Sequence, residues 1–148
     1  PESGGTTVAD GVSVSTSYKL GDTVITGITP GTGASSVLAN ISAGSGTVKV
    51  LKADGTENTG AVGTGNKIAV HANGTLVKQY DVVIYGDING DGKISVVDLV
   101  MMQKQILGTS QLSGAYAAAA DISRDGKVSV KDLVLLQKHI INAAQIEQ

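Results

Sequence analysis

The sequence predicts two modules: a small β-rich N-terminal domain, either α+β or immunoglobulin-like or β-grasp-like, followed by an all-α domain that carries two acidic loop–helix motifs. Three observations predict this. A stretch of 21 residues occurs twice near the C-terminus, and each copy joins an acidic loop to an apolar-periodic segment typical of a helix. Ahead of the repeat, alternating apolar residues indicate short strands. Asn73-Gly74 between two of these segments favours a tight hairpin turn.

The composition of the 148 residues argues against several classes of protein. The chain has no Cys and a net charge of −2, so neither a disulfide framework nor a basic nucleic-acid surface is expected. Its apolar runs are too short to cross a bilayer, and it carries no signal peptide. Because it begins at Pro1 without an initiator methionine, we expect a fragment of a longer, exported protein.

The N-terminal module is expected to hold short strands and one short helix. Its first residues, 1–17, are rich in Ser, Thr and Gly and predict a linker or frayed edge, although Val12 and Val14 could form an edge strand. The β module itself is expected at 18–85. Within it we expect one strand or two short ones flanking Gly21 at 18–28, further strands at 47–53, 67–72 and 75–85, and a helix at 35–41.

The second module is expected at 86–148 and follows the last predicted strand without a flexible linker. The two modules should therefore dock rigidly and share an interface. Helices are predicted at 95–107, around 113–119 and at 129–143. The inward apolar positions of the two long helices are Leu99, Met102 and Ile106, and Leu133, Leu136 and Ile140.

The repeated stretch runs from 87 to 107 and from 121 to 141. Its copies are identical at 13 of 21 positions, which indicates a duplicated unit. Oxygen-bearing side chains at loop positions 1, 3, 5 and 12, with Gly at 6, have the EF-hand spacing that surrounds a hard cation with oxygens. The predicted ligands of two Ca²⁺ ions are Asp87, Asn89, Asp91, Lys93 (backbone carbonyl), Ser95 (through water) and Asp98, and Asp121, Ser123, Asp125, Lys127, Ser129 and Asp132.

Charge supports this interpretation of the loops. A single acidic turn of this composition could simply be a tight turn, but two in-phase copies favour a metal site. Six carboxylates crowded into two loops repel one another without a cation, so folding and metal binding should be linked. Position 12 is Asp98 or Asp132, where the usual EF-hand has Glu, and a shorter arm can still be bidentate. The second site is expected to be weaker, because Ser123 replaces a better ligand and Arg124 adds a positive charge.

Each long helix has a second apolar face at helical spacing. Packing against the β module, or of one helix against the other, is one explanation. A partner protein is favoured, because one small β module can hardly cover both faces. The residues are Val97, Val100, Met101, Lys104 and Leu107 with Val96 at the helix start, and Lys131, Val134, Leu135, Lys138 and Ile141 with Val130 at the helix start.

Residues 86–142 resemble a dockerin, the calcium-dependent module that attaches enzymes and scaffoldins of clostridial cellulosomes to cohesin modules. The resemblance rests on the paired pattern D-x-[NS]-x-D-G-K-[IV]-S-V-x-D-L-V, on Gln-Lys further along each helix, and on a strand rather than a helix before Asp87. It implies an extracellular, cellulosome-associated or cell-surface module that binds a cohesin. The residues that it implies for this contact are Val96, Val97, Val100, Met101, Gln103, Lys104 and Leu107, and Val130, Lys131, Val134, Leu135, Gln137, Lys138 and Ile141.

The helix starts depart from one form of the family pattern. Dockerins that bind enzyme-carrying cohesins often have Ser-Thr where this chain has Val96-Val97 and Val130-Lys131. The more apolar residues resemble dockerins that anchor to the cell surface, and the β module resembles the X modules found ahead of them. A cohesin of a scaffoldin or of an anchoring protein is therefore expected, with the anchoring kind favoured. The near-repetition of the two helices also predicts two binding orientations. Their binding energies should differ, because Val97 in the first copy is aligned with Lys131 in the second and Gln105 is aligned with His139.

Other functions have weaker signals. An enzyme is not expected, since nothing pairs the carboxylates outside the loops and there is neither a Cys nucleophile nor a G-x-S-x-G motif. The alternative function is a carbohydrate-binding accessory module of an extracellular polysaccharide-degrading protein, which would need an aromatic platform from Tyr18, Tyr80 or Tyr85. A calcium sensor needs a helix entering each loop, and these loops lack one.

Overall fold

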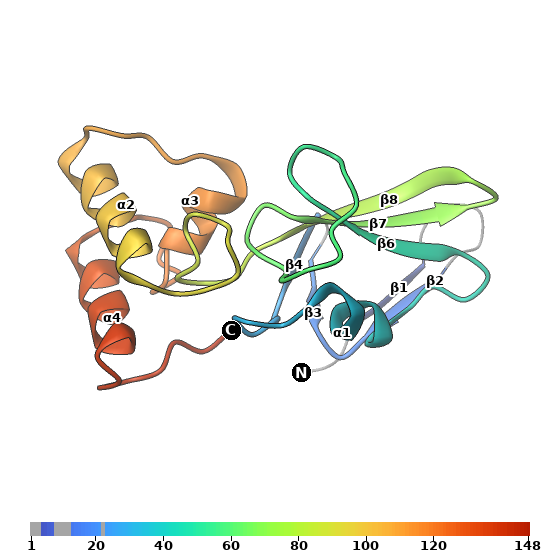
Figure 1. Ribbon diagram of the computed structural model, residues 1–148, viewed down its shortest axis with the longest axis horizontal. Coiled ribbons are helices and arrows are strands. Elements are labelled where there is room, and N and C mark those ends of the chain that lie inside the picture. Colours follow the sequence, from blue (N-terminus) through green and yellow to red (C-terminus); the bar gives the residue numbers. More distant parts are fainter. Residues whose placement is uncertain (1–3, 8–12, 22) are drawn as a thin grey trace.

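The computed structural model describes residues 4–7, 13–21 and 23–148. Figure 1 shows a β domain and a helical domain, joined where the chain leaves the last strand. Within the described part of the chain, no helix is long and apolar enough to cross a membrane. The elements are β1 (Gly4–Thr7), β2 (Ser13–Thr16), β3 (Lys19–Leu20), β4 (Val24–Thr26), α1 (Ala34–Ala39), β5 (Ile41–Ser42), β6 (Thr47–Leu51), β7 (Lys67–Ala72), β8 (Thr75–Val82), α2 (Val96–Leu107), α3 (Gly114–Ala120) and α4 (Val130–Ile140).

The larger sheet has five strands in the order β3-β4-β8-β7-β6. Strands β7 and β8 form the predicted hairpin, and both turn residues, Asn73 and Gly74, have positive φ (53° and 79°), as a type I′ turn requires. Of the two alternatives expected at 18–28, the structure has the second: two short strands, β3 and β4, on either side of Gly21. Strand β4 pairs in parallel with β8, with Val24 opposite Asp81. This parallel pairing joins distant segments, and local patterns did not predict it.

The smaller sheet, β1-β2-β5, includes two strands from the N-terminal segment, for which the sequence predicts a linker or frayed edge with a possible edge strand. Ser13–Thr16 is the central strand of this sheet, and Val14 and Thr16 are buried. The many Ser and Thr residues of this segment hide the alternation of apolar and polar residues that predicts a strand, although β-branched Thr suits a strand. Val12 lies outside the described residues. The predicted helix at 35–41 is also shorter, because Ile41 pairs with Thr16 in the sheet instead of continuing α1.

Two separate apolar clusters form the cores. The β-domain core includes Ile25, Val37, Ile68 and the fully buried Tyr80. The second core lies in the helical domain, where α2 and α4 contact each other. At its centre are Met102 and Leu136, which occupy equivalent positions in the two repeats, and the other predicted inward positions pack around them. The prediction of the helical core is confirmed.

Substitution of Leu136 tests this core. Leu136 is fully buried, so Leu136→Ala is expected to lower the free energy of unfolding by about 2–5 kcal/mol through lost burial and a cavity. Leu107→Ala is the matched control, because Leu107 is 76% exposed and should change stability by no more than about 0.5 kcal/mol. Denaturant titration of both variants measures the two effects. Equal effects of the two substitutions would contradict the assignment of inner and outer faces.

Candidate functional site

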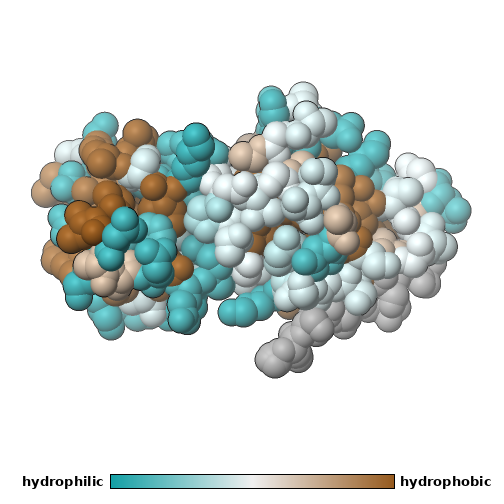
Figure 2. Space-filling view, turned by 60° about the horizontal axis from the view of Figure 1, so that its bottom comes forward, coloured by the Kyte–Doolittle hydropathy of each residue, from teal (hydrophilic) through white to brown (hydrophobic). Residues whose placement is uncertain are grey.

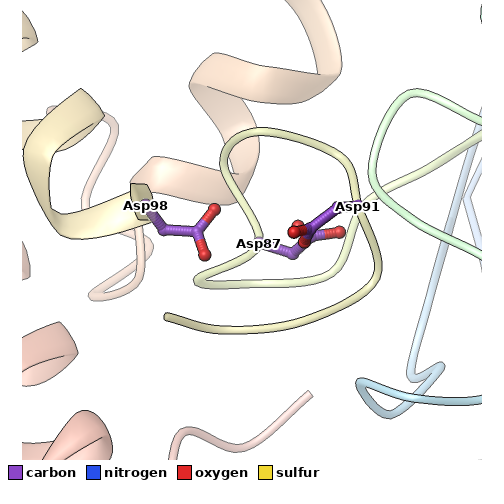
Figure 3. Close-up of side chains that lie close together, drawn as sticks. All are labelled: Asp87, Asp91 and Asp98. Carbon is purple, nitrogen blue, oxygen red and sulfur yellow. The ribbon is translucent and has the colours of Figure 1, made fainter. Parts of the chain in front are cut away.

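The first loop brings three carboxylates together. Asp87 follows the last strand, Asp91 lies in the loop and Asp98 lies in the first turn of α2; Figure 3 shows them in one small region. One oxygen of each lies within 4.8 Å of the others. Asp87 and Asp98 are fully buried, while Asp91 is exposed. Three carboxylates at this spacing form an all-oxygen donor set that suits a hard cation.

Asp87 is oriented by backbone N–H groups. Its Oδ1 accepts from Gly90 (3.1 Å), and its Oδ2 accepts from Gly92 (3.0 Å) and Thr64 (2.9 Å). Burial, together with the smaller effect of the charges of Asp98 and Asp91, raises the pKa of Asp87 to about 6, although the hydrogen bonds from Thr64 and Gly92 act to lower it. A divalent cation between the carboxylates would offset this unfavourable burial of charge.

Asp98 joins the loop to the helix. Its Oδ1 accepts from the N–H groups of Ile88 (2.8 Å) and Asn89 (2.9 Å), and its Oδ2 accepts from Ser95 (2.9 Å). Ser95 and Asp98 form a capping box at the start of α2. Burial raises the pKa of Asp98 as well. One carboxylate therefore stabilises both the helix start and the fold of the loop, and the short Asp side chain fits this position.

The second loop repeats the arrangement in a more open setting. The carboxylates of Asp121, Asp125 and Asp132 also lie within 4.8 Å of one another. Asp121 accepts from the N–H groups of Asp125 (3.2 Å) and Gly126 (2.9 Å). Asp132 is fully buried and forms the capping box of α4 with Ser129. The predicted metal-binding carboxylates are thus brought together in both loops, and either cluster could hold a metal ion.

The predicted partner-binding residues form an exposed face on the helices. Val96, Val97 and Leu107 of α2 are 59%, 53% and 76% exposed, and the equivalent Val130 and Ile141 are 59% and 72% exposed. Apolar side chains gather on the helical domain in Figure 2. Among the predicted contact residues, Met101 and Leu135 differ, because they are half-buried and pack against the helical core. The remaining predicted residues are exposed, so the β domain does not cover this face.

Sequence reasoning missed the contacts made by the C-terminal tail. The N–H of Tyr85 donates to Oε1 of Gln148 (2.6 Å), whose Nε2 donates to the carbonyl of Tyr85 (2.9 Å). The guanidinium of Arg124 lies 4.0 Å from the centre of the Tyr85 ring and also donates to the carbonyl of Glu147. The sequence predicts that the charge of Arg124 weakens the second site, and the structure adds that Arg124 holds the tail against Tyr85. The residue types alone gave no signal for this contact.

Two capped loop–helix units, related as repeats and packed through α2 and α4, define a duplicated EF-hand-like module. Residues 85–141 match the family model described as a dockerin type I domain. By this match, residues 85–141 form a dockerin type I domain, and a β-rich region precedes it. The matching model is the type I model, so the comparison gives no support to the surface-anchoring kind that Val96, Val97 and Val130 had favoured.

Similar solved structures come from Acetivibrio cellulolyticus. Two of them are ScaB dockerins, mutated in the N-terminal or the C-terminal helix, in complex with the third cohesin of ScaC. The first is 25% identical, covers 44% of this chain and 92% of its own, and gives a TM-score of 0.42. The second is 26% identical, covers 44% of this chain and 96% of its own, and gives a TM-score of 0.40. No curated protein matches the chain.

Proposed function

We propose that this chain is a calcium-dependent protein–protein interaction module that binds a cohesin and so attaches its parent protein to a cellulosome-type scaffold. The observation that carries the proposal is the exposed apolar face of α2 and α4, on a domain of the dockerin family. A face of this kind marks an interaction site in a protein of this size. An extracellular location follows from the same assignment, because dockerins belong to extracellular cellulosomes.

Two Ca²⁺ ions support this function by fixing the helices. Calcium suits the loops because their donors are oxygens and their backbone is arranged around the first Asp of each loop. When bound, the ions supply charge neutralisation and hold each loop against its helix. The proposed ligands are Asp87, Asn89, Asp91, Lys93, Ser95 and Asp98, and Asp121, Ser123, Asp125, Lys127, Ser129 and Asp132.

The cohesin surface is proposed to be apolar at its centre and polar at its rim. Val100 and Val134 lie within the exposed stripes, and Lys104 and Lys138 lie one helical turn further along. Fixing both helices before binding reduces the entropy lost on association, which favours high affinity. The proposed contact residues are Val96, Val97, Val100, Met101, Gln103, Lys104 and Leu107, and Val130, Lys131, Val134, Leu135, Gln137, Lys138 and Ile141.

The β domain is proposed to act as an X-like module that supports the dockerin. Its proposed extent is 18–85, with the described strands at 4–7 and 13–16 packed onto it, and the dockerin domain begins at 86. Carbohydrate binding by this domain is disfavoured. Tyr80 is fully buried, and the ring of Tyr85 lies beneath Arg124 and so offers no open platform. Only a dockerin and a β domain are identified in the described part of the chain, and no catalytic domain is evident there.

Calorimetric titration tests the proposed function. The full chain is titrated with a panel of enzyme-type and anchoring-type cohesins, first in calcium and then in excess chelator. Tight binding in calcium alone, to one class of cohesin, is expected and identifies the level of the assembly at which the parent protein docks. Absence of binding to every cohesin, with both helices intact by circular dichroism, would overturn the proposal.

A further inference from the structure

One loop of the β domain lies directly against the first metal loop, residues 87–98, which holds Asp87, Asp91 and Asp98. This β-domain loop, residues 61–65, precedes β7, and its Thr64 is 1% exposed. The N–H of Thr64 donates to Oδ2 of Asp87 (2.9 Å), the first predicted ligand. The Thr64 hydroxyl accepts from the N–H of Ile84 (3.0 Å) and donates to its carbonyl (3.2 Å). Thr64 therefore fixes both the Asp87 carboxylate and the chain that leads to it.

Glycines let the two backbones approach closely. A Cβ on Gly63 would lie 2.1 Å from the carbonyl oxygen of Gly90, a contact that real side chains do not make. On the other side, a Cβ on Gly90 would lie 2.5 Å from the carbonyl oxygen of Thr64. The N–H of Gly31 also donates to the carbonyl of Gly92 (2.8 Å). The first metal loop is therefore packed backbone against backbone on the β domain.

The β-domain loop is itself held in place by two buried amides. Nδ2 of Asn58 donates to Oδ1 of Asn66 (2.7 Å) and to the carbonyl of Ala61 (2.9 Å). Oδ1 of Asn66 also accepts from the N–H of Gly63 (3.2 Å). These bonds fix the loop from inside its own domain, so it presents a preformed surface to the metal loop.

Within the described residues, the second metal loop, residues 121–132, has no packing partner equivalent to the loop 61–65. Asp121 accepts from N–H groups of its own loop and is half-buried, whereas Asp87 is fully buried. A Cβ on Gly126, the equivalent of Gly92, would meet no atom of the described chain within 4 Å. A Cβ on Gly92 would lie 2.8 Å from the carbonyl oxygen of Val62. The two metal loops thus share a sequence pattern but differ in their surroundings.

We propose that the β-domain loop 61–65 is an outer part of the first calcium site, so that calcium binding there and docking of the β domain form one linked equilibrium. This proposal rests on the calcium binding proposed above. Groups that orient a metal ligand raise the affinity of the site. Linkage is reciprocal: loosening the docked loop lowers calcium affinity, and removing calcium loosens the docked loop. The second site is independent of the β domain.

Gly63→Ala tests the first direction. Gly63 lies outside the left-handed region, so alanine adds no backbone strain of its own and clashes only with the first metal loop, at the carbonyl of Gly90 and at the backbone nitrogen of Gly92 (2.8 Å). In calcium titrations of the full chain followed by calorimetry, one of two sites is expected to weaken by about 10- to 100-fold, with the other unchanged. Gly60→Ala is the matched control, because a Cβ on Gly60 comes no closer than 3.7 Å to Asn58; wild-type affinities are expected. Two unchanged sites in Gly63→Ala would overturn the proposal.

Hydrogen exchange of the unaltered chain tests the reverse direction and does not depend on how well Gly63→Ala folds. Peptides covering 61–65 are expected to exchange at least about tenfold faster in chelator than in calcium, while peptides from β6 and β7 stay unchanged. Equal protection of 61–65 in both conditions would overturn the proposal, whatever the variant does. If the unaltered chain bound no calcium, both this proposal and the proposed function would fail. Two bound ions with unchanged exchange would remove the linkage alone.

Discussion

Asp98→Asn is expected to lower the helicity of the chain and weaken cohesin binding by at least about 100-fold. Asp98 is buried, caps α2 and orders the first loop through three backbone N–H groups, in addition to its proposed role as a ligand. An amide of the same shape loses the charge that attracts the ion and presents a donor to one of these N–H groups. A site occupied at 100 times its dissociation constant contributes about 2.7 kcal/mol to stability, and this contribution would be lost.

The measurement combines circular dichroism with cohesin titration, in calcium and in chelator. Chelator is expected to have the same effect on the unaltered chain as the substitution, and to affect the second loop as well. Asp54→Asn is the matched control: Asp54 is exposed, and its Oδ1 accepts from Thr56, which an amide oxygen can also do. An unchanged spectrum in chelator would refute the coupling of metal binding to the helical fold.

The carboxylate clusters of the two acidic loops were predictable because their interactions are local. The predicted carboxylate ligands of each loop lie within 12 consecutive residues, and the capping boxes pair Ser95 with Asp98 and Ser129 with Asp132, three residues apart. Helix periodicity likewise placed Met102 and Leu136 inside and Val100 outside. Spacing along the chain determines these features, so they can be predicted directly from the sequence.

The missed features depend on pairing between distant segments. Thr64 lies 23 residues before Asp87, and nothing in a Gly-rich loop shows which partner it will meet. The polar neighbours of Val14 hide the strand pattern there, although the sequence left an edge strand possible at this residue. Two glycines in V-G-T-G could have served as a signal, because glycine often marks a close approach of backbones. That signal still would not have named the first metal loop as the partner.

Paired alanine substitutions on the two helices are expected to distinguish one binding orientation from two. Val96 and Val100 are 59% and 41% exposed, and the equivalent Val130 and Val134 are 59% and 40% exposed, so the pairs are closely matched. All four lie outside the buried core, unlike Met101 and Leu135, and their substitution should leave stability nearly unchanged. Each Val→Ala buried against a cohesin costs about 1 kcal/mol, so a pair in contact costs about 30-fold in affinity.

Three variants distinguish the two cases: alanine at Val96 and Val100, alanine at Val130 and Val134, and alanine at all four positions. If either helix can occupy the main contact position, removing one pair leaves the other orientation, and apparent affinity falls by only about twofold. Removing both pairs then costs about 30-fold. A single orientation predicts the full loss from one pair and almost none from the other. Because Val97 is matched by Lys131, the two orientations are not equal in energy, and the pair in the preferred orientation should show the larger of the two small losses. Calorimetric titration of all three variants against the same cohesin therefore shows both how many orientations exist and which one is preferred.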